Sequence, residues 1–189
     1  MSGDILDECF RWYHTSAIRL ETLQAYSAGE AEAERMAAWK RGHPIPERSV
    51  RTNDYLREVA AGVLAGRERQ RFRIVDHPAS EYTRFETLVS YPESAAAGEE
   101  IRIAVRGGGS PDAQKALAGI ASDAWFFDLG TEDEACVLLE YEADGTFTAV
   151  HLATEVDHRY LRRLLAKTAE HSIPLAEYAA QARRRTAAA

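Results

Sequence analysis

Arginines and glutamates recur at alternating positions of the sequence, in a spacing that could bind an acidic ligand. Arg19 and Glu21 lie two positions apart in an apolar stretch, and Arg71 and Arg73 repeat this spacing in a second one. An extended backbone directs residues i and i+2 to the same face of a strand. Guanidinium groups bind carboxylates and phosphates through paired hydrogen bonds, and neighbouring glutamates can orient them. We therefore predict a groove whose ligand-binding residues are Arg19, Glu21, Arg84, Glu86 and Arg102.

An ordinary structural explanation competes with this groove. The same alternation is typical of a solvated sheet face with ion pairs between neighbouring strands. If the groove instead belongs to an enzyme, Glu86 or Asp128 would act as the general base, because a positioned carboxylate can remove a proton from a reacting group. The sequence favours a non-catalytic role and leaves the enzyme alternative open.

Motifs for metal, phosphate or nucleophilic chemistry are weak in this sequence. The six histidines are scattered without the spacing of metal ligands, which favours surface or helix-capping roles. The glycine run 107–109 before Ser110 could cradle a phosphate at the start of a helix. It lacks the patterns of phosphate-binding loops, so a flexible loop is the expected structure. No metal site and no cofactor are predicted.

The composition is that of a globular protein with an acidic surface. Hydrophobic residues make up 46% of the 189 residues, charged residues make up 28%, and the formal net charge is -7. Because an acidic surface repels phosphate, direct nucleic-acid binding is not expected. The two cysteines lack metal-site spacing and are predicted to be reduced thiols. Without a signal peptide or a long apolar run, we expect a cytoplasmic protein that does not bind membranes.

Hydrophobic periodicity and turn residues predict alternating helices and strands. The expected helices cover residues 4–12, 30–40, 54–65, 81–91, 111–117 and 157–171, followed by a last turn at 175–178. The expected strands cover residues 17–23, 71–76, 100–105, 125–129, 136–142 and 146–152. The fourth helix is expected to end before Pro92, because a proline removes a backbone donor.

This order of elements predicts an α/β (α+β) fold with a mixed sheet of about five to six strands and flanking helices. The strand–helix–strand series over 71–105 is long enough for a crossover that joins parallel strands. The last three strands form an expected antiparallel meander, with Asp144-Gly145 in a type I′ hairpin turn. We expect a single domain over residues 1–182 and a disordered tail over 183–189.

Six short stretches of the sequence form a recognisable series. They are Leu6–Phe10, Ala17–Leu23, Tyr82–Glu86, Ala97–Arg102, Trp125–Asp128 and Ile173–Tyr178. In order and spacing this series resembles an actinobacterial family of unknown function whose members are often encoded beside helix-turn-helix regulators. The resemblance covers nearly the whole chain and implies a regulatory role, without an established reaction.

A fainter similarity concerns the fold. The order of a strand, a helix, Gly98–Arg102, Phe126–Asp128, a meander and a closing helix is similar to half of a phospholipase-D-like domain. That fold also serves as a non-catalytic sensor domain in some regulators. The catalytic His-x-Lys motif is missing, because His158 is followed by Arg159 and Tyr160. The resemblance therefore does not imply hydrolase activity, and a fold alone does not determine function.

Charge is also segregated near the end of the chain. Acidic residues gather between 128 and 144, and basic residues follow along the expected helix 157–171. These could be two solvated faces or a docking surface for a basic protein. We predict a regulatory or sensor module that acts with a protein partner, such as a helix-turn-helix DNA-binding protein, and binds a small anionic ligand. The alternative is an enzyme of specialised metabolism or of nucleotide and phosphate chemistry. The sequence leaves open whether the protein forms a homo-oligomer.

Overall fold

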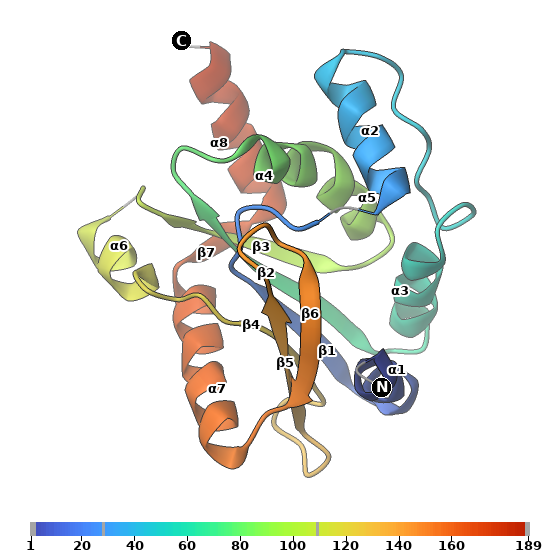
Figure 1. Cartoon of the computed structure of the whole chain (residues 1–189), viewed down its shortest axis with the longest axis vertical. Helices are drawn as coiled ribbons and strands as arrows, with labels where there is room; N and C mark the ends of the chain where they lie inside the picture. The colour runs from blue at the N-terminus through green and yellow to red at the C-terminus, as the bar shows by residue number, and fades with distance from the viewer. Residues whose placement is uncertain (1–2, 28, 109, 188–189) are drawn as a thin grey trace.

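A single mixed sheet forms the centre of the structure, a computed structural model that describes residues 3–27, 29–108 and 110–187 (Figure 1). The strands lie in the order β6-β5-β4-β1-β2-β3-β7. Their bounds are β1 Ser16–Glu21, β2 Glu68–Asp76, β3 Glu100–Arg106, β4 Asp123–Phe127, β5 Ala135–Tyr141, β6 Phe147–Leu152 and β7 Ser172–Pro174. The predicted α/β class with a mixed sheet is confirmed.

The helices connect the strands and flank the sheet. Their bounds are α1 Gly3–Trp12, α2 Glu30–Lys40, α3 Asp54–Leu64, α4 Glu81–Phe85, the π-helical turn η1 Glu86–Ser90, α5 Tyr91–Ala96, α6 Pro111–Leu117, α7 Glu155–Glu170 and α8 Leu175–Ala187. Strands β2 and β3 are parallel and joined through α4, η1 and α5, so the predicted crossover is confirmed. A second, unpredicted crossover joins the parallel strands β1 and β2 through α2 and α3.

The sheet has one strand more than the largest number expected. Strand β7 covers only Ser172–Pro174 and pairs antiparallel with β3 at the edge of the sheet. A three-residue strand is too short to show an alternating pattern, and an edge is where a sheet tolerates proline. Helix α8 follows directly and extends to Ala187, so helical structure continues into part of the expected tail 183–189.

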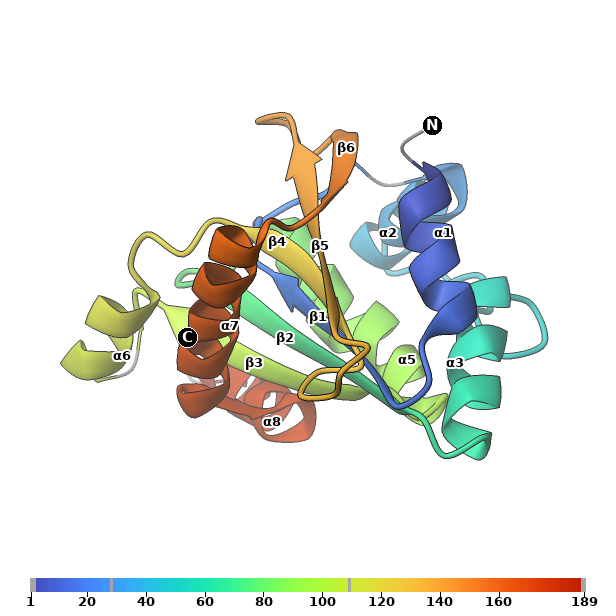
Figure 2. The same ribbon diagram turned by 90° about the horizontal axis from the view of Figure 1, so that it is seen from below.

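Hydrophobic cores form on both faces of the sheet. On one face, helices α6 and α7 cover a core around Leu20, Ile74 and Phe126. On the other face, α1 packs against β4 and β5, and α8 and the η1–α5 segment pack near β3. Figure 2 shows α6 and α7 on one side of the sheet and α1, α3 and α5 on the other. Within the described ranges, no helix combines the length and apolar character needed to cross a bilayer.

The helical segment after Ser80 continues beyond the expected end at Pro92. Ser80 caps it, and its side chain accepts a hydrogen bond from the Thr83 N–H. The backbone then passes through η1 into α5, with Pro92 in the first turn of α5. In a first turn the missing N–H of proline is tolerated, so Pro92 does not end this segment.

The hairpin between β5 and β6 is present, but its turn is not type I′. A type I′ turn needs positive φ at both central residues, whereas only Gly145 has one, at 84°. The Gly145 N–H donates to the Glu142 carbonyl across 2.9 Å, and the Glu142 N–H donates to Thr146 across 2.8 Å. These bonds describe a turn followed by a left-handed glycine, which places Gly145 at the buried tip of the hairpin.

Candidate functional site

Strand register brings four charged side chains to one buried face of the sheet. In the parallel pair β1–β2, Arg19 is the partner of Arg71 and Glu21 is the partner of Arg73. All four residues are at most 9% exposed. Buried charges are costly unless they are paired, so the carboxylates around these arginines determine whether the arrangement is stable.

Glu21 connects the two neighbouring arginines. Its Oε1 atom accepts from Arg19 Nε across 3.4 Å and also from Arg71 Nη1. Arg71 has a second partner, Glu99, at 3.1 Å. Burial alone would raise the pKa of Glu21, but Arg71, Arg19 and Arg73 together hold this pKa well below its usual range. Glu21 is therefore an ionised carboxylate at neutral pH.

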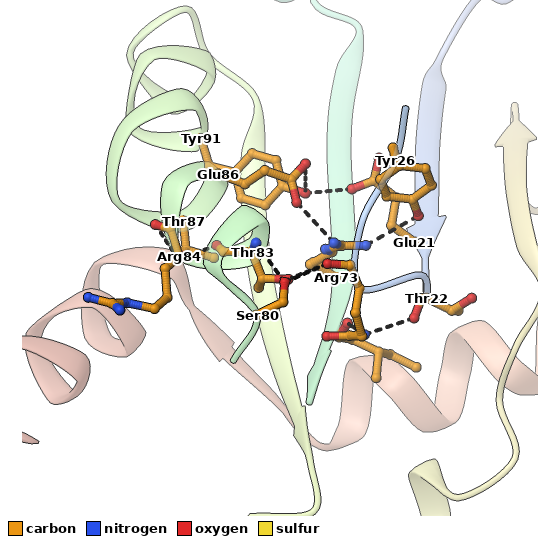
Figure 3. A network of polar contacts seen from close by, with 12 residues as sticks. Glu21, Thr22, Tyr26, Arg73, Ser80, Thr83, Arg84, Glu86, Thr87 and Tyr91 are labelled. Atoms are coloured by element: carbon orange, nitrogen blue, oxygen red, sulfur yellow. Dashed lines mark hydrogen bonds and ion pairs between the residues drawn. The ribbon is translucent and has the colours of Figure 1, made fainter. Parts of the chain in front are cut away.

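Arg73 and Glu86 form a second pair in the same layer. Arg73 Nη2 donates to Glu86 Oε2 across 2.9 Å, and Arg73 is fully buried. Figure 3 shows Arg73 between Glu86 and Tyr26. Glu86 begins the π-helical turn η1, a type of helix distortion that is frequent at functional sites. Burial raises the pKa of Glu86 to about 7, because Arg73 offsets only part of the desolvation and Glu21 adds repulsion.

Asp123 and two tyrosines complete the network around Arg19. Arg19 Nη2 donates to Asp123 Oδ2 across 3.1 Å and to the Tyr141 hydroxyl across 2.9 Å. The Tyr26 hydroxyl donates to the same carboxylate, and Thr22 bonds its other oxygen. Asp123 lies at the start of β4, beside the carboxyl end of β1, so the antiparallel β1–β4 pair brings these groups together.

The β5–β6 hairpin holds the loop that carries Tyr26. The Ser27 N–H donates to the Gly145 carbonyl across 2.9 Å. A Cβ atom on Gly145 would lie 2.5 Å from the Ala25 carbonyl oxygen, so this contact requires glycine. The tip of the hairpin thus fixes the loop 22–27 across the network.

A cavity of about 360 Å³ lies against these side chains. Its charged lining residues are Arg19, Glu21, Glu32, Arg48, Arg71 and Glu86, and its aromatic ones are Tyr26, Tyr55, Tyr82, Tyr91, Tyr141 and Phe147. A second cavity of about 470 Å³, between α2, the 47–53 segment and α3, shares Glu32, Arg48, Tyr55 and Ser90 with the first. The two cavities therefore adjoin, and the first falls within the usual size range of small-molecule sites.

Two guanidinium nitrogens of the network, Arg19 Nη1 and Arg73 Nε, have no partner among the described residues, and of these two residues Arg19 lines the cavity. Arg19 Nη1 is buried and makes no hydrogen bond to any group in the part of the chain that the structure describes. A buried N–H without an acceptor costs about 1–3 kcal/mol, and Arg19 lines the cavity. A ligand with an acceptor group in this cavity could remove that cost.

The structure brings together three of the five residues predicted to bind a ligand. Arg19, Glu21 and Glu86 share the network, but the other two lie elsewhere. Arg84 is exposed, with its guanidinium carbon 5.9 Å from the centre of the Trp39 ring, and Figure 3 shows it pointing away from Arg73. Helical geometry explains this difference, since residues two apart on a helix face different directions.

Arg102 lies on the opposite face of the sheet. It is registered with Phe72, whose side chain belongs to the core beneath α7. Its guanidinium donates to the Ser172 hydroxyl and carbonyl, both across 3.0 Å. Its role in the structure is therefore to hold the edge strand β7, and the single groove expected from five residues does not form.

Asp128, the other candidate base, is a structural carboxylate outside both cavities. Its Oδ1 atom accepts from the His14 N–H across 2.9 Å and from the Thr15 N–H and hydroxyl across 2.6 and 2.9 Å. Burial would raise the pKa of Asp128, but these backbone hydrogen bonds lower it below its usual value. Asp128 follows the end of β4, whereas the network surrounds Asp123 at the start of that strand.

The sequence contains signals for some of the missed members of the network and none for others. The alternation of Arg71 and Arg73 marks them as companions of Arg19 and Glu21. Asp123 precedes an apolar strand, but nothing in the sequence indicates that its carboxylate faces Arg19. Tyr26 and Tyr91 come from a loop and a helix, and only the fold brings their hydroxyls to the strands. Within the described residues, no group of three histidine, cysteine, aspartate or glutamate side chains is placed to hold a metal ion.

Comparison with known protein families matches residues 4–180 to the Domain of unknown function (DUF6879). Since this match covers most of the 189 residues, the chain belongs to that family. Neither the curated proteins nor the solved structures contain a significant match.

Proposed function

We propose that this DUF6879 domain is a non-catalytic regulatory or sensor module that binds a small ligand through an acidic group and acts with a protein partner. The observation that carries this proposal is that Arg19 lines the 360 Å³ cavity while its buried Nη1 atom has no partner among the described residues. A ligand carboxylate at this nitrogen would form a charge-assisted hydrogen bond in a site already shielded from water. We place the acid group at Arg19 and assign Arg48 a supporting role near the opening shared with the second cavity.

The rigidity of the network supports binding rather than turnover. Arg71 and Arg73 are held by Glu21, Glu99 and Glu86, so the floor of the cavity is ordered before a ligand arrives. A preorganised site loses less entropy on binding. The Thr22 hydroxyl bonds Asp123, whereas a hydrolytic nucleophile would require a histidine or another base beside it.

Exposed apolar side chains on β6 and α7 support the partner part of the proposal. Phe147 lines the cavity and is 45% exposed. Leu152, Val156 and Tyr160 follow it from the edge strand β6 into α7, and each is also largely exposed. Exposed apolar patches are typical of protein interaction sites. A helix-turn-helix regulator remains our proposed class of partner.

One observation favours an enzyme as the second candidate. Glu86 is a buried acid at the cavity, and its pKa of about 7 suits a group that gives and takes a proton at neutral pH. In this alternative, Glu86 acts as the general base on a ligand held by Arg19. The enzyme candidate predicts conversion of the bound molecule, which the module does not.

Calorimetric titration with small acids tests the proposed function. Acetate, benzoate, succinate and inorganic phosphate serve as probes against wild type, Arg19→Gln and Arg48→Gln. Arg84→Gln and Arg102→Gln are matched controls, because these arginines lie outside the cavity. We expect at least one probe to bind wild type and both controls equally, and Arg19→Gln about tenfold more weakly.

The same samples distinguish the binding module from the enzyme. Circular dichroism verifies that each variant is folded, and Arg48→Gln, whose side chain is 20% exposed, covers the case in which Arg19→Gln unfolds. No binding by any acid, or equal weakening in the two controls, would disprove the proposed site. Conversion of a bound probe followed by NMR in wild type but not in Glu86→Gln would establish the enzyme instead.

A further inference from the structure

A second charged group of the cavity lacks a partner. Glu32 lies in the first turn of α2 and lines both adjoining cavities. Across the residues that the structure describes, its carboxylate has no hydrogen-bond or ion-pair partner, although it is only partly exposed. Burial raises the pKa of Glu32, and Arg48 offsets this rise only in part. Desolvation without a partner is unfavourable for a carboxylate, so a cationic group placed here would be stabilised.

Charged side chains of both signs line the cavity. Three arginines, Arg19, Arg48 and Arg71, face three glutamates, Glu21, Glu32 and Glu86. A ligand with two or more negative charges, such as a phosphate monoester, would lie close to the carboxylates of the lining as well as to Arg19 and Arg48. A cation alone would leave Arg19 Nη1 unpaired. A molecule with one charge of each sign satisfies both free groups.

We propose that the ligand is zwitterionic, a free α-amino acid whose carboxylate binds Arg19 and whose ammonium group binds Glu32. This inference rests on the proposed function and assigns the chemical class of its ligand. The volume of about 360 Å³ accommodates an amino acid, given that one water molecule occupies about 30 Å³ of liquid. It also makes Glu32, absent from the residues predicted from the sequence, a determinant of specificity.

The aromatic residues of the lining provide a surface on which the side chain of the ligand can pack. Tyr82 and Tyr141 line the cavity together with Phe147 of the hairpin. Aromatic walls bind apolar and aromatic groups through their faces, and they also favour cations. Within the described part of the chain neither the Tyr82 hydroxyl nor the Tyr141 hydroxyl, which accepts from Arg19, donates to an acceptor, so both can donate to a polar ligand atom. We therefore place the ammonium group toward Glu32 and the side chain toward the hairpin.

Matched ligands test this class directly on wild-type protein. The twenty L-amino acids are screened by thermal shift, and the strongest binder is titrated beside its analogue without the amino group and its analogue without the carboxyl group. We expect the intact amino acid to bind about tenfold more tightly than either analogue. Glu32→Gln should remove the advantage over the analogue without the amino group, while Glu34→Gln, an exposed neighbour on α2, should keep it.

Each result decides between the inference and the proposed function. If the analogue without the amino group binds as tightly as the amino acid, or if Glu32→Gln does not change this comparison, the inference of a zwitterionic ligand is wrong. The proposed acid-binding site at Arg19 is then unaffected. If none of the amino acids binds while benzoate, succinate or phosphate does, the inference also fails alone. If neither the amino acids nor these acids bind, the proposed function fails with it.

Discussion

The Tyr91 hydroxyl donates a hydrogen bond to Glu21 Oε2 across 2.7 Å, joining residues 70 positions apart in the chain. The oxygen of the Tyr91 hydroxyl also lies 3.2 Å from Glu86 Oε1. A phenol has one proton, so it donates to one carboxylate at a time and can accept from the other. While the Tyr91 hydroxyl donates its hydrogen bond to Glu21, a protonated Glu86 can donate to the Tyr91 oxygen. This arrangement agrees with the pKa of about 7 that burial gives Glu86.

Replacement of Tyr91 by phenylalanine should destabilise the protein by about 1–3 kcal/mol, because Glu21 loses a donor that it cannot replace from water. Tyr160→Phe is the matched control, since Tyr160 is 45% exposed, and we expect no measurable change there. Urea denaturation of both variants gives the two free energies of unfolding. Equal values for the two variants would show that the Tyr91 hydroxyl does not support the network.

The raised pKa of Glu86 predicts a dependence of stability on pH. The folded protein holds a proton on Glu86 up to about pH 7, whereas an unfolded chain loses it near the usual value of 4.5. The stabilising contribution is therefore complete below 4.5 and is lost as the pH rises to 7. Between pH 5 and 7.5 wild type should lose about 2 kcal/mol relative to Glu86→Gln, which cannot titrate there.

Denaturation curves of wild type and Glu86→Gln at half-unit steps of pH measure this difference. Other titrating groups affect both proteins in the same way, so only the difference between the curves reports on Glu86. Two parallel curves between pH 5 and 7.5 would mean that Glu86 is ionised throughout this range. In that case the enzyme candidate would also lose its support.

Local patterns were sufficient to predict the strands that form the site and its first charged residues. The alternation predicts that Arg19 and Glu21 share one face of β1 and that Arg71 and Arg73 share one face of β2. The register of the two strands then brings the pairs to the same face of the sheet. The parallel β2–β3 crossover follows from the length of the intervening helical segment. These predictions depend only on the two-residue period of a strand and on the reach of the chain.

The partners of these arginines depend on the tertiary structure. Arg102 has the same strand pattern as Arg73, but its position in β3 is one residue out of phase with Ile101 and Ile103, which face the network side. A shift of one residue moves a side chain to the other face of a sheet. Asp123 and Tyr26 reach the site through the β1–β4 pairing and the hairpin contact, neither of which has a local pattern in the sequence.

Asp128 should be important for stability and not for ligand binding. It accepts hydrogen bonds from the backbone at His14, Thr15 and Ser16, so Asp128→Ala leaves several donors unsatisfied. We expect a loss of about 3 kcal/mol in the free energy of unfolding, with the affinity of the folded protein for small acids unchanged. Asp133→Ala, at an exposed position of the same loop, is the control. If Asp128→Ala changed the affinity for small acids strongly and left the free energy of unfolding unchanged, Asp128 would be a ligand-binding residue.

Gly145 should be necessary for the geometry of the cavity, and Gly119 provides a matched comparison. Both have positive φ, 84° and 72°, so an alanine at either position carries a similar backbone strain of about 1 kcal/mol. Only at Gly145 would the new Cβ also meet the loop that carries Tyr26, whereas Gly119 faces open space. Gly145→Ala should therefore cost about 1–3 kcal/mol more than Gly119→Ala.

Hydrogen exchange separates this contact from general destabilisation. The Ser27 amide donates to the Gly145 carbonyl, so its exchange should accelerate in Gly145→Ala and keep the wild-type rate in Gly119→Ala. Binding of small acids should weaken in the first variant alone, because Tyr26 is part of the cavity lining. Equal exchange of Ser27 in both variants would show that the hairpin does not hold the loop, and that Tyr26 is positioned by Asp123 and Arg73 without it.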